Sequence, residues 1–309
     1  MKYAIVFPGQ GSQSLGMLSE LAENFSIVKD TFTEASDALS FDLWKLTQED
    51  QEGLNQTQNT QPAMLAAGYA TYRVLSSETE LSPICMAGHS LGEYTALVAS
   101  GSLGFGDGIK LVRTRAELMQ SAVPAGVGAM AAILGLEDEV VVKVCADYSG
   151  EGIVQAVNFN SNGQVVIAGN KAAVDATCEA MKAAGAKRAV LLPVSVPSHC
   201  SLMDEAALKF KTEVDAIQFS MGSIDVLHNV DAAKASNIDE MKAKLVAQLH
   251  KPVLWTGTVR AMHKFGVEKL IESGPGKVLA GLTRRIEKSL TANAVLDSAS
   301  VAATLEEIK

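Results

Sequence analysis

The chain has 309 residues, 48% of them hydrophobic and 20% charged, and carries a formal net charge of −9. This composition is typical of a globular protein with enough core for one large domain or two. The negative charge argues against a general binder of nucleic acid or of anionic membranes. No apolar run approaches the roughly 20 residues that span a bilayer.

The first residues predict a buried strand, not a targeting signal. The apolar run from Ala4 to Phe7 is too short for a signal peptide and leads into a glycine-rich loop, residues 7–13. The loop is not a dinucleotide fingerprint, because Ser14 stands where the third glycine would be. It can aim backbone N–H groups at an anionic oxygen, or simply connect a strand to a helix, and the spacing favours neither. Helical structure is expected next over residues 15–37, in one or two pieces. A further helix, with proline in its first turn, is expected over residues 61–75.

A G-x-S-x-G pattern follows, formed by Gly88, Ser90 and Gly92. The apolar residues 84–87 before it predict a strand, and residues 94–100 after it predict a buried helix. A sharp strand-to-helix turn can hold its central serine in a strained, exposed position, where glycines permit the close approach of strand and helix. The alternative is a plain corner in which the serine only caps the helix.

An arginine lies on the apolar face of the next predicted helix. After a loop over residues 101–108, a helical stripe of apolar residues comprises Ile109, Val112, Ala116, Met119 and Val123. Arg115 lies on that stripe, and a buried guanidinium is costly unless it meets an anion. Its partner is either a carboxylate of this chain or the carboxylate of a substrate.

The middle of the chain predicts a small domain of its own. Strands are expected over residues 129–134, 153–158, 164–168 and 189–194, with helices over 137–147 and 171–184. This order, β-α-β-β-α-β, is typical of a ferredoxin-like fold. We therefore expect residues 126–196 to be inserted into a larger domain made of residues 1–125 and 197–309.

Strands and helices alternate again in the last third of the chain. Helices are expected over residues 202–217, 238–249 and 255–265 and at the C-terminus, and strands over 225–230, 269–272 and 294–296. Such alternation predicts an α/β fold with a mainly parallel, hydrolase-like sheet covered by helices on both faces. The segment Ser273-Gly274-Pro275-Gly276-Lys277 is not a phosphate-binding loop, because Ile271 and Val278 stand where that motif needs glycine and Ser or Thr.

A serine nucleophile needs a base, and the chain has five histidines. We expect His199 to be the base, because it follows a predicted strand, where catalytic residues gather in α/β folds. The side chain of His89 should leave the turn in another direction, and His228 should be structural. His250 and His263 are expected to be exposed near helix ends.

The remaining reactive side chains predict neither a metal site nor disulfides. No histidine pair has metal-ligand spacing. The cysteines also lack the spacing of a zinc site or a disulfide frame, and they are expected to be buried thiols of a cytoplasmic protein: Cys85, Cys145, Cys178 and Cys200.

Five ordered motifs resemble those of the malonyl-CoA:acyl carrier protein transacylases of bacterial fatty acid synthesis, and the resemblance covers nearly the whole chain. They are Phe7-Pro8-Gly9-Gln10-Gly11-Ser12-Gln13, Gly88-His89-Ser90-Leu91-Gly92-Glu93, Asn158-Phe159-Asn160-Ser161, Pro197-Ser198-His199 and Glu272-Ser273-Gly274-Pro275-Gly276. The resemblance implies a ping-pong acyltransferase with no cofactor, whose partners are malonyl-CoA and the phosphopantetheine thiol of an acyl carrier protein. We expect a monomer.

The resemblance also assigns roles to residues. Ser90 is the nucleophile that becomes malonylated, and His199 is the base that activates it and then protonates the departing thiol. The backbone N–H groups of Gln10 and Leu91 form the oxyanion hole, and Arg115 pairs with the malonyl carboxylate.

Further residues are expected to support this site. The backbone carbonyl at Gln248 is the usual acceptor that orients the histidine in this family, and Asn229 is a weaker candidate for support, so the sequence leaves open which of them orients His199. His89 and Ser198, which adjoin the two catalytic positions, complete the supporting set.

Three other functions remain open at this point. A serine hydrolase would share the G-x-S-x-G turn, with Asp204 or Asp225 as the third member of a triad. A non-catalytic docking subunit would keep the fold and discard the chemistry. An acyltransferase of a polyketide-type or polyunsaturated-lipid pathway would use the same chemistry with another carrier. Residues Val196-Pro197-Ser198 before the base, and a chain that ends soon after its last helix, favour a free-standing enzyme of fatty acid synthesis.

Overall fold

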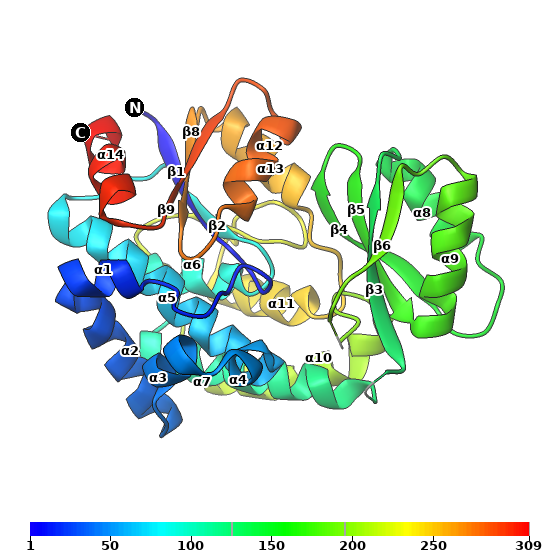
Figure 1. Ribbon diagram of the computed structural model, residues 1–309, viewed down its shortest axis with the longest axis horizontal. Helices are drawn as coiled ribbons and strands as arrows, with labels where there is room; N and C mark the ends of the chain where they lie inside the picture. Colours follow the sequence, from blue (N-terminus) through cyan, green and yellow to red (C-terminus); the bar gives the residue numbers. More distant parts are fainter. Residues whose placement is uncertain (125, 195, 309) are drawn as a thin grey trace.

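The computed structural model describes residues 1–124, 126–194 and 196–308. It has a larger lobe and a smaller one, drawn in green at the right of Figure 1. No helix in these three ranges is both long and apolar enough to cross a membrane.

A parallel sheet forms the centre of the larger lobe. Its strand order is β7-β2-β1-β8-β9 and all four neighbouring pairs are parallel. The strands are β1 (Tyr3–Phe7), β2 (Met86–Gly88), β7 (Val226–Leu227), β8 (Lys269–Ser273) and β9 (Thr291–Val295). Phe7 pairs with Gly88, so the C-terminal ends of β1 and β2 meet beside the turn that carries Ser90. The predicted α/β class is confirmed, although the strand expected over residues 225–230 is only two residues long.

Helices bury both faces of this sheet. In β1, Tyr3, Ile5 and Phe7 face one core, and Ala4 and Val6 face the other. Because both faces of the strand are buried, all five of its residues are hydrophobic. The helices of the first core include α1 (Ser19–Asn24), α2 (Ser26–Leu39), α5 (Thr57–Glu78), α6 (Gly92–Ala99), α7 (Phe105–Ala122), α10 (Asp204–Ala216), α11 (Ile238–Gln248) and α14 (Ser298–Ile308). Those of the second core are α12 (Trp255–Lys264) and α13 (Val278–Ile286).

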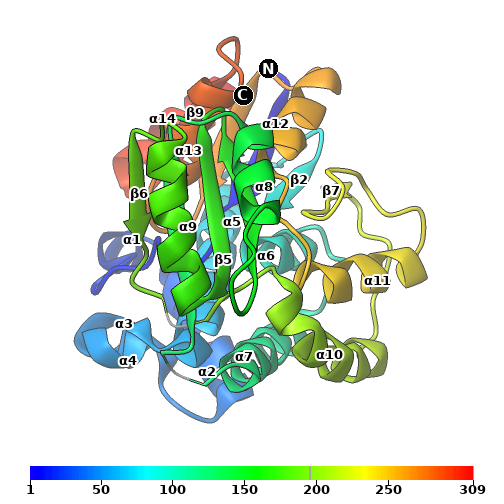
Figure 2. The ribbon, with the colours of Figure 1, turned by 90° about the vertical axis from the view of Figure 1, so that its right-hand side faces the viewer.

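The smaller lobe has the element order that the sequence predicted. It consists of β3 (Gly128–Leu134), α8 (Asp138–Ala146), β4 (Val154–Ser161), β5 (Gln164–Asn170), α9 (Lys171–Ala183) and β6 (Arg188–Leu191). The sheet order is β4-β5-β3-β6 with antiparallel neighbours, which is the ferredoxin-like arrangement. In Figure 2, α8 and α9 cover the outer face of this sheet, so its other face turns toward the larger lobe. The domain boundaries stay a prediction.

Two helices begin earlier than expected. Pro62 lies inside α5 because Arg113 donates to the carbonyl of Gln58, the acceptor that the missing proline N–H leaves free, at 3.2 Å. α7 begins at Phe105, inside the predicted loop, and Gly108 in its first turn permits close packing against α6. A Cβ on Gly108 would lie 2.9 Å from a methyl carbon of Val98.

Two short helices, α3 (Leu43–Glu49) and α4 (Gln51–Asn55), were not predicted at all. Their N-terminal backbone N–H groups are capped by the side chains of Asp42 and Asp50.

Candidate active site

The turn at Ser90 depends on its two glycines. A Cβ on Gly88 would lie 1.8 Å from the main-chain carbon of Gly92, and a Cβ on Gly92 would lie 2.1 Å from the carbonyl oxygen of Phe7. Ser90 itself has φ +50°, a conformation that side-chain-bearing residues rarely adopt. The backbone is therefore a strained strand–turn–helix elbow, as the sequence predicted.

Ser90 and His199 lie in hydrogen-bond contact. The Oγ–Nε2 distance is 2.8 Å, and His199 Nδ1 donates to the main-chain oxygen of Gln248 at 2.6 Å. Because Nδ1 carries the proton, Nε2 is free to accept the serine proton. Burial, with the nearby Arg115 cation, lowers the pKa of His199 to about 3, so the imidazole is neutral near pH 7. This pair can transfer a proton from the serine hydroxyl to the ring.

Arg115 is 1% exposed and its guanidinium faces Ser90. It donates to Gln61 Oε1 at 2.8 Å, to Gln248 Oε1 at 2.9 Å and to Ser90 Oγ at 3.3 Å. None of the carboxylates in the described part of the chain forms an ion pair with it. The reading of Arg115 as half of an internal ion pair is therefore wrong. The burial that lowers the pKa of its guanidinium is not offset by a direct anionic partner.

A cavity of about 120 Å³ brings these groups together. Its wall includes Gln10, Ser90, Leu91, Arg115 and His199, together with His89 and Ser198. The backbone N–H groups of Gln10 and Leu91 have no hydrogen-bond acceptor within residues 1–124, 126–194 and 196–308. Two free donors beside a nucleophile are what an oxyanion hole requires.

The two supporting residues that the sequence left open do different things. Gln248 contacts His199 through its carbonyl. Asn229 does not contact His199: its side chain accepts from Ser90 N at 2.7 Å and donates to Gly88 O at 2.7 Å. The structure thus brings Gln248 to the histidine and Asn229 to the elbow backbone.

The other predicted residues lie at the edges of the site. His89 Nε2 contacts Asn160 Oδ1 at 2.8 Å, and burial lowers the pKa of the ring. Ser198 donates to Val196 O at 3.4 Å. His228 is buried and His263 is exposed, as expected, while the expected exposure of His250 is reduced by its contact with Asp204.

Two further residues of the site, Gln61 and Glu93, were not predicted from the sequence. Gln61 holds Arg115 from the helix whose beginning was misplaced, and it is 1% exposed. Glu93 is 0% exposed in the first turn of α6. A carboxylate in an otherwise apolar helix is a signal that could have identified it, since a buried charge requires partners.

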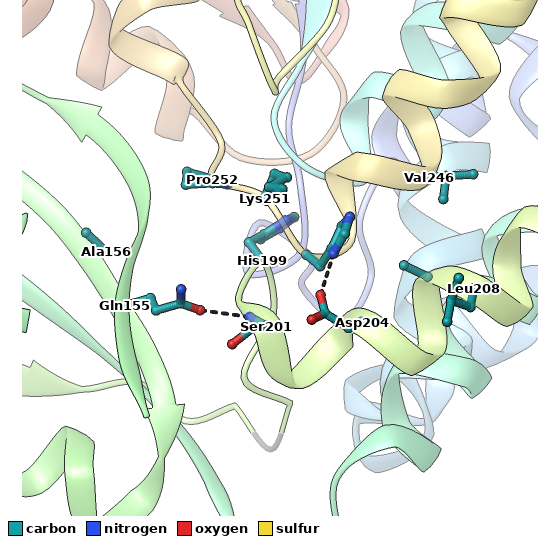
Figure 3. A pocket seen from close by; sticks show the side chains of 11 residues that line it. Gln155, Ala156, His199, Ser201, Asp204, Leu208, Val246, Lys251 and Pro252 are labelled. Carbon is teal, nitrogen blue, oxygen red and sulfur yellow. Dashed lines mark hydrogen bonds and ion pairs between the residues drawn. The ribbon is translucent and has the colours of Figure 1, made fainter. Parts of the chain in front are cut away.

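A second cavity, of about 470 Å³, opens on the other side of the His199 loop. Figure 3 shows that it lies between the smaller lobe and the helices α10 and α11. Gln155 of β4 accepts from the backbone N–H of Ser201 at 2.8 Å, and Asp204 accepts from His250. Among the described residues, only His199 lines both cavities.

Across the described residues, no group of three or more His, Cys, Asp or Glu side chains is arranged to hold a metal ion. The four cysteines are buried free thiols, as predicted, and burial raises the pKa of Cys200, beside His199, to about 11.

Comparisons with known proteins agree with the geometry. A family model described as acyl transferase domain matches residues 4–305. The chain is 52% identical to malonyl CoA-acyl carrier protein transacylase of Escherichia coli K12 over 99% of both chains, and 42% identical to the protein of that name in Bacillus subtilis over 100% of this chain and 98% of the other.

Solved structures are equally similar. An acyl carrier protein S-malonyltransferase from Vibrio cholerae has 54% identity and a TM-score of 0.96, covering 98% of this chain and 100% of the other. A malonyl-transacylase solved with its type II polyketide acyl-carrier protein has 50% identity and a TM-score of 0.98, covering 99% of this chain and 100% of the other.

Proposed function

The chain belongs to the acyl transferase domain family, and from this premise and the site geometry we propose how it works. It transfers a malonyl group from malonyl-CoA to the phosphopantetheine thiol of an acyl carrier protein. The acyl group passes through an ester on Ser90. The resemblance that the sequence motifs carried is confirmed at the level of the family.

The observation that carries the proposal is the buried guanidinium beside the serine. Arg115 NH2 lies 3.3 Å from Ser90 Oγ and has only neutral hydrogen-bond partners among the described residues. An acyl group that ends in a carboxylate supplies the missing anion, whereas an acetyl group leaves the cation buried and unpaired. This preference points to a malonyl donor.

The first half-reaction forms the ester. Ser90 gives its proton to His199 Nε2 while Oγ attacks the thioester carbonyl, and the backbone N–H groups of Gln10 and Leu91 bind the resulting oxyanion. Collapse of the intermediate breaks the carbon–sulfur bond. The CoA sulfur leaves with the proton that His199 held.

The second half-reaction runs the same steps in reverse. The carrier thiol gives its proton to His199 and attacks the Ser90 ester. Collapse then breaks the ester bond, and Ser90 Oγ recovers the proton from Nε2. One neutral histidine with one free nitrogen thus serves both halves, first as base and then as acid in each.

A serine hydrolase with a Ser-His-Asp triad does not fit this site. The group that holds His199 Nδ1 is the Gln248 carbonyl, not a carboxylate. The carboxylate of Asp204 accepts a hydrogen bond from His250, and that of Asp225 pairs with Lys234. Neither carboxylate is therefore directed at the dyad of Ser90 and His199. The presence of nucleophile, base and cation in one cavity likewise argues against a purely docking subunit.

We further propose that the carrier belongs to fatty acid synthesis and that the protein is cytoplasmic. The four buried free thiols suit a reducing compartment. One solved relative is titled as a complex with a type II polyketide carrier, so a polyketide carrier is the second candidate acceptor.

The experiment is an initial-rate matrix in which malonyl-CoA and holo acyl carrier protein are varied independently. The proposal predicts parallel double-reciprocal lines, and, without carrier, a burst of one CoA per enzyme that then stops. Steady CoA release without carrier would show hydrolysis instead. Comparing carriers of fatty acid and polyketide type by kcat/KM then decides between the two acceptors.

A further inference from the structure

Glu93 is a fully buried carboxylate three residues after the nucleophile. Its Oε1 contacts His228 Nδ1 at 2.7 Å, and its Oε2 accepts from the backbone N–H of Asn229 at 2.9 Å and from Gln248 Nε2 at 2.9 Å. No Lys or Arg in the described ranges pairs with it. A carboxylate buried at this cost and bonded mainly to neutral donors needs a reason beyond packing.

One reason lies in the orientation of the Gln248 amide. Arg115 has only donors, so the Gln248 atom that faces it at 2.9 Å must be the amide oxygen. The amide nitrogen then faces two acceptors, Glu93 Oε2 and the main-chain oxygen of Ser90, each at 2.9 Å. The carboxylate therefore keeps the oxygen of Gln248 turned toward Arg115.

A second connection runs from Glu93 to the elbow. By accepting from the backbone N–H of Asn229, the carboxylate fixes the residue whose side chain holds both Ser90 N and Gly88 O. Ser90 has a positive φ, which needs such support from its surroundings.

We propose that Glu93 is the positioning residue that sets the preference for a carboxylated acyl donor. Its carboxylate orients Arg115 through Gln248 and supports Ser90 through Asn229, and it forms no direct hydrogen bond with either residue among its described contacts. This inference rests on the proposed function, because it concerns how that site selects its donor.

The interposed amide explains why the carboxylate is not placed directly on Arg115. A direct ion pair would occupy the guanidinium and compete with the malonyl carboxylate. With Gln248 between them, Glu93 still attracts the cation across two hydrogen bonds of 2.9 Å, and the guanidinium stays available to substrate.

The test compares Glu93→Gln with Glu272→Gln. Glu272 is also 0% exposed, but its carboxylate accepts from Leu279 and Ala280 at the start of α13. For Glu93→Gln, the acylation kcat/KM should fall about 100-fold with malonyl-CoA and about 10-fold with acetyl-CoA, since small misplacements at a reacting centre have effects of this size. Glu272→Gln should lower Tm and leave the malonyl-to-acetyl ratio unchanged.

A charge-swap variant covers the case in which Glu93→Gln does not fold. In Glu93→Gln/Gln248→Glu the amide and carboxylate exchange places, so the net charge is kept and the new carboxylate contacts Arg115 directly. We expect a folded protein whose malonyl-to-acetyl ratio is at least ten-fold below that of the wild type.

The outcomes separate the two hypotheses. A wild-type ratio in either Glu93 variant, or an equal fall of the ratio in Glu272→Gln, would overturn the role of Glu93. If the wild-type protein itself forms no malonyl ester, the proposed function fails, and with it the premise of this inference.

Discussion

The two residues of the dyad share an unusual backbone feature. Ser90 has φ +50° and His199 has φ +66°, and both carry side chains. Such conformations cost roughly 1–3 kcal/mol each and persist only where surrounding contacts determine them. Here Asn229 holds the backbone N–H of Ser90, and the carbonyl of Leu249 accepts from that of His199 at 3.0 Å. The backbone strain is thus located at the two residues whose side chains form the Oγ–Nε2 hydrogen bond.

Arg115 gives the first prediction at this scale. Replacing Arg115 by Ala should lower kcat/KM for malonyl-CoA by about 100-fold or more, because a charge-assisted bidentate contact is lost, and should affect acetyl-CoA much less. Arg115→Lys keeps the positive charge but cannot form two parallel hydrogen bonds to a carboxylate. It should therefore give an intermediate loss of kcat/KM for malonyl-CoA. Acylation rates with the two donors measure the effect. Equal losses with both donors would contradict the role of Arg115 as a clamp.

The second prediction at the residue scale concerns the pH dependence of His199. Burial and the charge of Arg115 lower its pKa from 6.5 to about 3, so the base should stay unprotonated well below pH 6.5. A plot of log kcat/KM for malonyl-CoA against pH should therefore be flat from pH 7 to pH 5. An acid limb with an apparent pKa near 6.5 would show that the ring is more exposed to water than the structure has it.

At the scale of elements, the elbow depends on backbone contact between β1, β2 and α6. Gly92→Ala would force a Cβ to 2.1 Å from the carbonyl oxygen of Phe7, so the variant should lose about 3 kcal/mol or more of its free energy of unfolding. Gly281→Ala in α13 is the control, since nothing lies within 4 Å of its added Cβ. It should be neutral or stabilise by about 0.5–1 kcal/mol. Urea unfolding of both variants tests this, and a stable Gly92→Ala would refute the close approach.

A helix or strand could be predicted from the sequence where neighbouring residues determine it, and could not where a contact with a distant part of the chain determines it. The elbow and the β-α-β-β-α-β order followed from glycine positions and apolar periodicity, which are local signals. The start of α5 did not, because it depends on Arg113 reaching the carbonyl of Gln58 from another helix. Local patterns carry no information about such a contact.

The residues of the site also differ in whether local sequence patterns could identify them. Ser90, His199 and Arg115 stand in recognisable patterns, and the structure brings all three to one cavity. The partners that hold them are separated by long stretches of chain: Glu93 and Gln248 are 155 residues apart, and Ser90 and Asn229 are 139 apart. Hydrogen bonds of this kind become visible only after the chain has folded.

At the scale of the whole molecule, the smaller lobe is joined to the larger through β4. Phe159 N donates to Val253 O at 3.0 Å and Val253 N donates to Val157 O at 2.8 Å, which covers an otherwise free sheet edge. The same strand contributes Asn158 to the wall of the cavity that contains Ser90 and His199. The lobes therefore meet at the cavity that contains Ser90, Arg115 and His199.

The stability of the molecule should depend on pH in a direction set by two buried histidines. Burial lowers the pKa of both His89 and His199 below 6.5. As the pH falls below 6.5, the unfolded chain binds protons that the native state does not, so stability falls, by up to about 1.4 kcal/mol per pH unit for each ring. Thermal unfolding should show Tm decreasing from pH 7 to pH 5. A constant Tm over this range would contradict the neutral buried rings.

The central claim is that Ser90 carries the acyl group between two thiols. Intact-mass measurement after brief incubation with malonyl-CoA, followed by peptide mapping, tests it most directly. The account predicts one malonyl adduct on Ser90 that disappears when holo acyl carrier protein is added, and no adduct in Ser90→Ala. Release of CoA with no adduct on the protein, or an adduct on another residue, would contradict it.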